Sequence, residues 1–126
     1  MDKNFFEKQT VKKPGIIKKN KKSDDGGMPK KFLKNRQSCK VTFTLPKEAV
    51  TGVKKVNVLG DFNNWDKNAT PLKKLRTGNF STILELASGR SYRFKYLIDG
   101  SRWENDWHAD HYAPNPYGGD DSVVSL

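Results

Sequence analysis

The chain has 126 residues, and its 24 basic and 14 acidic side chains give a formal net charge of +10. This length suits one compact domain, the single Cys39 excludes an internal disulfide, and the lack of a long apolar run excludes a membrane-spanning helix. Residues 1–40 carry 13 basic and 4 acidic side chains and so supply +9 of the net charge. The net charge of the whole chain therefore says little about what residues 41–126 bind.

Lysine, asparagine, glycine and proline dominate residues 1–36, where apolar residues occur only as isolated pairs such as Phe5-Phe6. Such a segment cannot bury enough apolar surface to offset the entropy of ordering it. We therefore expect a mostly disordered tail over residues 1–36 and one folded domain over residues 37–126. No apolar stretch follows the early lysines as it would in a secretory signal, so we expect a cytoplasmic protein.

After the tail, short apolar alternations are separated by turn residues, which is typical of β-strands. The first predicted strand, residues 39–45, has its apolar residues on one face. The next lies within residues 53–60 and turns Val56 and Val58 to one face and Leu59 to the other.

Two further alternating segments, residues 80–86 and 92–100, are separated by a short turn, so we expect them to form a hairpin. In the second segment the core face carries Tyr92, Phe94, Tyr96 and Ile98. Lys95 then projects from the outer face. A last strand over residues 122–126 is expected to return to a sheet edge. Strands of this length and spacing predict an all-β domain, an immunoglobulin-like sandwich of two sheets.

Three tryptophans lie in polar, turn-like segments: Trp65 follows "DFNN", and Trp103 and Trp107 lie in "DGSRWENDW". An indole ring can bury about 150–250 Å², so each ring either closes an end of the sandwich or forms a binding surface. For Trp107, flanked by Asp106 and His108, we expect the closing role. For the other two, the surrounding amides and carboxylates favour sugar binding, because a flat ring packs against the C–H face of glucose while polar groups pair with its hydroxyls.

The ordered series "VLGDFNNWD", "GRSYRFKYLIDG", "RWENDW", "NPYGG" and "SVV" resembles the family 48 carbohydrate-binding modules. These include the isoamylase N-terminal early-set domains and the glycogen-binding domain of the AMP-activated protein kinase beta subunit. The resemblance spans roughly residues 38–126. Within the family, the chain resembles the small bacterial proteins that consist of such a domain and little else. It implies an immunoglobulin-like sandwich of early-set type that binds α-1,4-linked glucans such as glycogen, starch or maltodextrins, without a cofactor.

The resemblance implies a carbohydrate site made of Asn64, Trp65, Lys95, Trp103, Tyr117 and Asp121. Asn64 would shape the turn that presents Trp65. Tyr117 is the nearest match to an apolar side chain that the kinase-subunit domain pushes through a cyclic sugar. Asp121 is a departure, because the family has an asparagine there. A carboxylate accepts hydrogen bonds from hydroxyls but cannot donate them.

Other functions stay open. The lysine-rich tail could neutralise phosphates, so salt-dependent nucleic-acid binding is one alternative. A protein-interaction or regulatory module that docks a glycan-metabolising enzyme is another. The "HADH" stretch, residues 108–111, is a weak metal signal, because it lacks a thiol or a third histidine. No nucleophile, base and orienting group can be assembled, so we expect neither enzyme activity nor a metal, and we expect no membrane partner.

Overall fold

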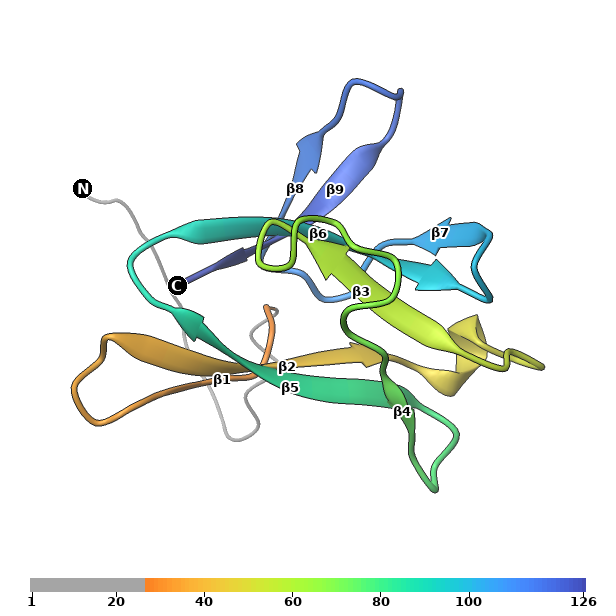
Figure 1. The fold of residues 1–126 in the computed structure, drawn as a ribbon, viewed down its shortest axis with the longest axis horizontal. Coiled ribbons are helices and arrows are strands. Elements are labelled where there is room, and N and C mark those ends of the chain that lie inside the picture. The colour runs from red at the N-terminus through yellow and green to blue at the C-terminus, as the bar shows by residue number, and fades with distance from the viewer. Residues whose placement is uncertain (1–26) are drawn as a thin grey trace, which may run out of the picture.

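The computed structural model describes residues 27–126, which form two facing antiparallel sheets (Figure 1). The four-stranded sheet has the order β1-β2-β5-β4, and the five-stranded sheet has the order β3-β6-β9-β8 with β7 paired to β6. The strands are Lys30–Phe32 (β1), Ser38–Leu45 (β2), Val56–Gly60 (β3), Lys73–Lys74 (β4), Phe80–Ala87 (β5), Ser91–Ile98 (β6), Arg102–Glu104 (β7), His111–Pro114 (β8) and Asp120–Ser125 (β9). A 3-10 turn, η2, spans Lys47–Ala49. The expected immunoglobulin-like sandwich is confirmed.

The core lies between the sheets and follows the alternation of the strands. On β2, Val41, Phe43 and Leu45 are fully buried. On β6 the buried face carries Tyr92, Phe94, Tyr96 and Ile98, as expected. The Phe43 and Phe94 rings meet edge to face across the core with centroids 5.0 Å apart. Burying each such ring contributes on the order of 1.5–3 kcal/mol, so these two strands fix the packing of the sandwich. In the part of the chain that is described, no helix is long and apolar enough to span a bilayer.

The outer face of the five-stranded sheet is also covered. Leu59 and Leu97 point away from the core, yet they are only 1% and 4% exposed. Leu97 lies opposite Trp103 in the β6–β7 register, and Leu59 lies opposite Lys95 in the β3–β6 register. Opposite residues of neighbouring strands share a face, so large side chains rest on this outer surface.

The hairpin expected from residues 80–86 and 92–100 is wrong. β5 pairs with β2 and β4, whereas β6 pairs with β3, β7 and β9. The connection changes sheets within a few residues, since the Ser88 N–H still donates to Gln37 while the Arg90 carbonyl accepts from Leu126. A hairpin would put both apolar faces on one sheet. The crossing instead lets the two strands bury those faces against each other.

One domain boundary and the place of one strand also differ from expectation. Residues 27–36 belong to the sandwich and not to the tail, because β1 pairs with β2 and Met28 is buried in the core. The Met28 N–H also donates to the Asp110 carboxylate at 3.0 Å, a long-range contact that the local composition does not reveal. The last strand, β9, lies between β6 and β8 and so is not at an edge. The rest of the predicted tail, residues 1–26, lies outside the described residues.

Candidate functional site

A groove with a volume of about 780 Å³ lies on the outer face of the five-stranded sheet. It is lined by Asp61, Trp65, Arg93, Lys95, Trp103, Asn115, Pro116, Tyr117, Gly119 and Asp121. These residues come from the loop after β3, from β6 and β7, and from the β8–β9 hairpin, which projects from the sandwich in Figure 1. The groove therefore joins segments that are up to 60 residues apart in the chain, from Asp61 to Asp121.

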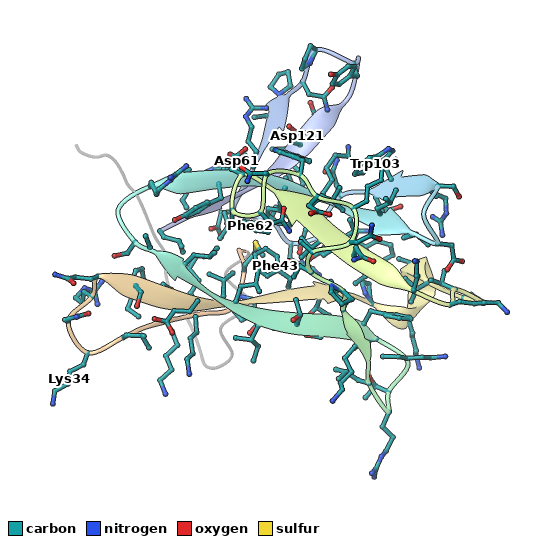
Figure 2. The ribbon with its side chains drawn as sticks, in the orientation of Figure 1. Lys34, Phe43, Asp61, Phe62, Trp103 and Asp121 are labelled. Carbon is teal, nitrogen blue, oxygen red and sulfur yellow. The ribbon has the colours of Figure 1, made fainter. Side chains whose placement is uncertain are left out.

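The loop after β3 is tied to the core on one side and open on the other. Phe62 turns inward and packs on Phe43 with ring centroids 5.4 Å apart (Figure 2). The Asn63 side chain accepts from the Gly60 N–H at 3.0 Å and donates to the Val58 carbonyl at 2.9 Å, which closes the turn. Trp65 then follows with its indole partly exposed toward the groove.

The backbone at this turn is strained. Asn64 and Trp65 both have a φ of 57°, in the left-handed region. Asparagine tolerates that region, but a bulky residue such as tryptophan is uncommon there, and the conformation costs on the order of 1–2 kcal/mol. The Trp65 N–H donates to the Gly60 carbonyl at 3.0 Å, which helps to hold it. Strain that the surrounding structure maintains is typical of functional positions.

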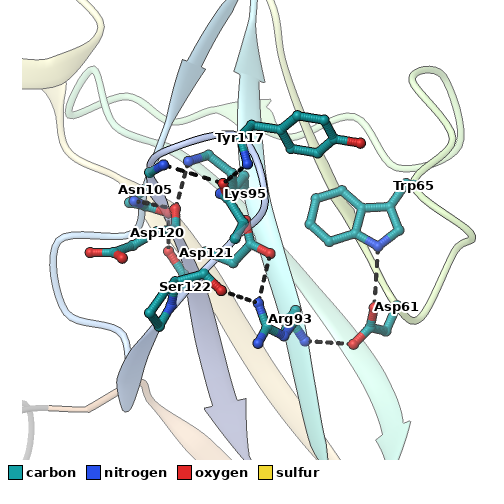
Figure 3. Close-up of polar contacts among 12 residues, drawn as sticks. Asp61, Trp65, Arg93, Lys95, Asn105, Tyr117, Asp120, Asp121 and Ser122 are labelled. Carbon is teal, nitrogen blue, oxygen red and sulfur yellow. Dashed lines mark hydrogen bonds and ion pairs between the residues drawn. The ribbon is translucent and has the colours of Figure 1, made fainter.

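One carboxylate fixes the Trp65 ring. Asp61 accepts from the indole Nε1–H at 3.2 Å and from the Arg93 backbone N–H at 2.8 Å (Figure 3). The indole N–H is thus satisfied by the protein, so what the ring offers to the groove is its apolar face.

Trp103 supplies a second indole to the groove. It lies on β7 opposite Leu97, and 47% of its surface is exposed. About half of this large apolar side chain is therefore open to a ligand in the groove.

Charged groups line the floor of the groove. Lys95 donates to the Asp120 carbonyl at 2.7 Å and makes no other hydrogen bond to residues 27–126, so two of its three ammonium protons are left for a ligand in the groove. Arg93 Nη1 donates to Asp121 Oδ2 and to the Pro114 carbonyl, both at 3.2 Å. Its Nη2 and Nε groups make no hydrogen bond to residues 27–126.

Asp121 is buried, and both of its oxygens have partners. Oδ2 accepts from Arg93, and Oδ1 accepts from Asn115 Nδ2 at 3.0 Å. Asn115 in turn accepts from the Tyr117 N–H at 2.9 Å, which shapes the tip of the β8–β9 hairpin. Tyr117 is 92% exposed at that tip. The carboxylate thus braces the arginine and the loop that carries the tyrosine (Figure 3).

Five of the six residues expected from the sequence line the groove, namely Trp65, Lys95, Trp103, Tyr117 and Asp121. The side chain of Asn64 is exposed and is not among the lining residues. Arg93, Asp61 and Asn115 were not expected. Strand parity puts Arg93 on the same face as Lys95, so that signal was present in the sequence, whereas Asn115 reaches the site only through the hairpin fold.

Trp107 does not close the sandwich as expected, since 47% of its surface is exposed. The buried carboxylate beside it, Asp106, has that interior position instead. Asp106 accepts from the Tyr96 hydroxyl at 2.6 Å and from the His108 N–H at 2.7 Å. Burial raises the pKa of Asp106, and burial together with this carboxylate raises the pKa of Tyr96 well above its usual value.

The "HADH" stretch lacks the ligand set of a metal site. Asp110 accepts from Lys30 at 2.7 Å and from the Ser125 N–H at 2.8 Å, so both of its oxygens have structural partners. Within residues 27–126, no group of three or more histidine, cysteine or acidic side chains is arranged to hold a metal ion.

Known proteins match both the sequence and the fold. The family model described as the glycogen recognition site of AMP-activated protein kinase matches residues 34–123. The 1,4-alpha-glucan branching enzyme GlgB of Butyrivibrio fibrisolvens is 38% identical over 58 residues, which are 46% of this chain and 9% of that enzyme. The 5'-AMP-activated protein kinase subunit beta-1 of Sus scrofa is 42% identical over 55 residues, which are 44% of this chain and 41% of that subunit. The matched segments thus cover less than half of either relative.

Among solved structures, the enterobactin esterase FES from Shigella flexneri aligns with a TM-score of 0.64 over 82% of this chain and 33% of the esterase. At 11% identity, that likeness shows a shared fold alone. The family model, in contrast, extends over most of the chain and over the groove from Asp61 to Asp121. The chain belongs to the carbohydrate-binding family of the glycogen recognition site of AMP-activated protein kinase.

Proposed function

We propose that the groove binds α-1,4-linked glucan chains without acting on them. The observation that carries this proposal is a pair of indoles, the partly exposed Trp65 and the exposed Trp103, lining one groove with Tyr117 at its rim. The family match and the name of one relative, a 1,4-alpha-glucan branching enzyme, support glucan as the ligand class.

The physical basis is stacking combined with hydroxyl pairing. The C–H face of a glucose unit packs against the face of an indole, and a contact of about 50 Å² contributes on the order of 1 kcal/mol. Lys95 and Arg93 have donors left for the hydroxyls at the sugar edge. With two stacked units, we expect a dissociation constant in the micromolar to millimolar range, because association itself is costly.

The charges of the groove favour a neutral ligand. Two cations, Arg93 and Lys95, are balanced by two carboxylates, Asp61 and Asp121, among the lining residues. A site for a phosphate backbone would carry an excess of positive charge. The same carboxylates hold the Trp65 indole, the Arg93 backbone and guanidinium and the Asn115 amide, which gives both a positioning role. This supports binding without catalysis.

A fluorescence titration with maltoheptaose tests the proposal. The wild-type chain should give a saturable change in tryptophan emission, and Trp65→Ala should weaken binding roughly five- to tenfold, as expected for the loss of about 1 kcal/mol. Ile83→Ala is the matched control, because Ile83 is an exposed apolar residue of β5 on the other sheet. Equal affinities for Trp65→Ala and the wild type would overturn the proposal.

A further inference from the structure

Two exposed aromatic side chains lie outside the groove. Trp107 is 47% exposed and Tyr112 is 49% exposed, and neither lines the cavity described above. The Tyr112 hydroxyl donates to the carbonyl of Asp106 at 2.6 Å, directly before Trp107 in the chain. The Tyr112 ring is therefore anchored to the residue that precedes Trp107.

These rings belong to the opposite side of the five-stranded sheet from the groove. On β8, Tyr112 lies opposite Ser122, and Ser122 lies opposite the core residue Phe94. Asp121, one residue away on β9, faces the groove. The segment before Trp107 lies on the Tyr112 side as well, because Asp106 bonds to the Ser122 hydroxyl and the buried Tyr96 hydroxyl.

The polar atom of each ring is held by the protein, and about half of each residue's surface is exposed, so the open part of each ring is apolar. The Trp107 indole N–H donates to Glu104 Oε2 at 3.1 Å, and Arg102 lies 3.6 Å from the other oxygen of that carboxylate. This is the arrangement found at Trp65, whose indole N–H is held by Asp61 four residues earlier. A ring held in this way offers its apolar face to a partner and resists rotation.

We propose that Trp107 and Tyr112 form a second glucan-binding platform, on the opposite side of the β8–β9 hairpin from the groove. The inference rests on the proposed function, since the ligand class is the same. The platform stacks glucose units on its two rings, and the partly exposed Glu104 carboxylate and the exposed His108 imidazole lie beside it to pair with hydroxyls.

Two weak platforms on one rigid domain change how it binds a branched polymer. Once the groove holds one chain, neighbouring chains of the same particle are present at a high local concentration, so that the second platform raises the overall affinity without new contacts at the first. A short oligosaccharide bound at the groove brings no neighbouring chains to the second platform. The second platform therefore contributes mainly to the affinity for polymer.

The chain's three tryptophans allow a direct test. In the double variant Trp65→Ala/Trp103→Ala, Trp107 is the remaining indole and reports on its own site. We expect its emission and its indole N–H resonance to change saturably with maltoheptaose at millimolar concentration. If neither signal changes, the second platform is refuted. The groove's function is judged separately, from the titration of Trp65→Ala alone.

A polymer assay gives the second measurement. In native gels containing glycogen, Trp107→Ala should weaken retention about tenfold, while its affinity for maltoheptaose at the groove stays within about twofold of wild type. Trp107→Phe, which keeps an aromatic face, should restore part of the retention, and Ile83→Ala should behave as wild type. Unchanged retention of Trp107→Ala, with Trp65→Ala impaired, would overturn the second platform and leave the proposed function intact. Equal losses on glycogen and on maltoheptaose would also overturn it, because the two sites would then not be independent.

Discussion

Replacing Gly60 with alanine tests how the fold positions Trp65. An added Cβ would lie 2.5 Å from the Arg93 carbonyl oxygen, 2.8 Å from Phe94 Cβ and 2.9 Å from Phe62 Cε2. Normal carbon contacts are about 3.5–4.0 Å, so β3 and β6 must separate or the loop must tilt. Overpacking typically costs about 1–3 kcal/mol, and we expect the upper end, because two of the three contacts involve β6 atoms that cannot rotate away.

A loss of about 3 kcal/mol corresponds to a fall of roughly 12–24 °C in Tm for a domain of this size. Because the Gly60 carbonyl accepts the Trp65 N–H, the same shift should displace the indole and weaken maltoheptaose binding roughly fivefold. Gly119→Ala is the control for stability, since its new Cβ would come no nearer than 3.9 Å to another atom. Because Gly119 lines the groove, Ile83→Ala on the other sheet is the control for binding. Calorimetric scans and fluorescence titrations measure both effects. If Gly60→Ala melts like the wild type, or melts early but binds normally, the positioning argument is wrong.

Three further predictions concern the rim of the groove, the charged residues on its floor and a carboxyl group in the protein interior. Tyr117→Ala should change the free energy of unfolding by less than about 0.5 kcal/mol while weakening glucan binding severalfold; a large loss in urea denaturation would show that the exposed ring supports the fold. A double-mutant cycle of Arg93→Met and Asp121→Asn should give a coupling of about 1 kcal/mol, since the carboxylate is buried but the arginine is partly exposed; additive effects would contradict the bracing role. Burial raises the pKa of Asp106 above its ordinary 3.8, so the folded state holds that proton more tightly than the unfolded state does. The stabilisation of the folded state by the protonated Asp106 carboxyl is therefore fully present below about pH 3.8 and is lost as the pH rises through the pKa of the folded state. Asp106→Asn should remove this pH dependence. An Asp106 carboxyl resonance that titrates below about 3.8 would contradict the direction of the pKa shift.

Alternation along single strands predicted much of the fold. The inward faces of β2 and β6 were correct, because the period of a strand directly reports which residues face the core. Which strands pair with each other could not be predicted from alternation within single strands. The connection from β5 to β6 has the composition of a tight hairpin turn, but the burial of both apolar faces against each other decides its path, and that is a tertiary effect.

The candidate site was partly predictable for the same reason. Strand parity and the family resemblance pointed to Lys95 and the two groove indoles. The bracing of Arg93 by Asp121 depends on β9 lying beside β6, which no local pattern reports. The expectation that Trp107 closes the sandwich is wrong because polar neighbours in the sequence do not show which side chain of a loop is turned inward. In this loop the inward side chain is that of Asp106.

The most direct test of the account is a backbone amide and indole resonance map of the full chain during titration with maltoheptaose. The account predicts that the largest changes cluster at Trp65, Arg93, Lys95, Trp103 and Tyr117, with β2 and β5 of the other sheet unaffected. Changes centred on the four-stranded sheet, or no saturable change at the groove at millimolar sugar, would contradict it.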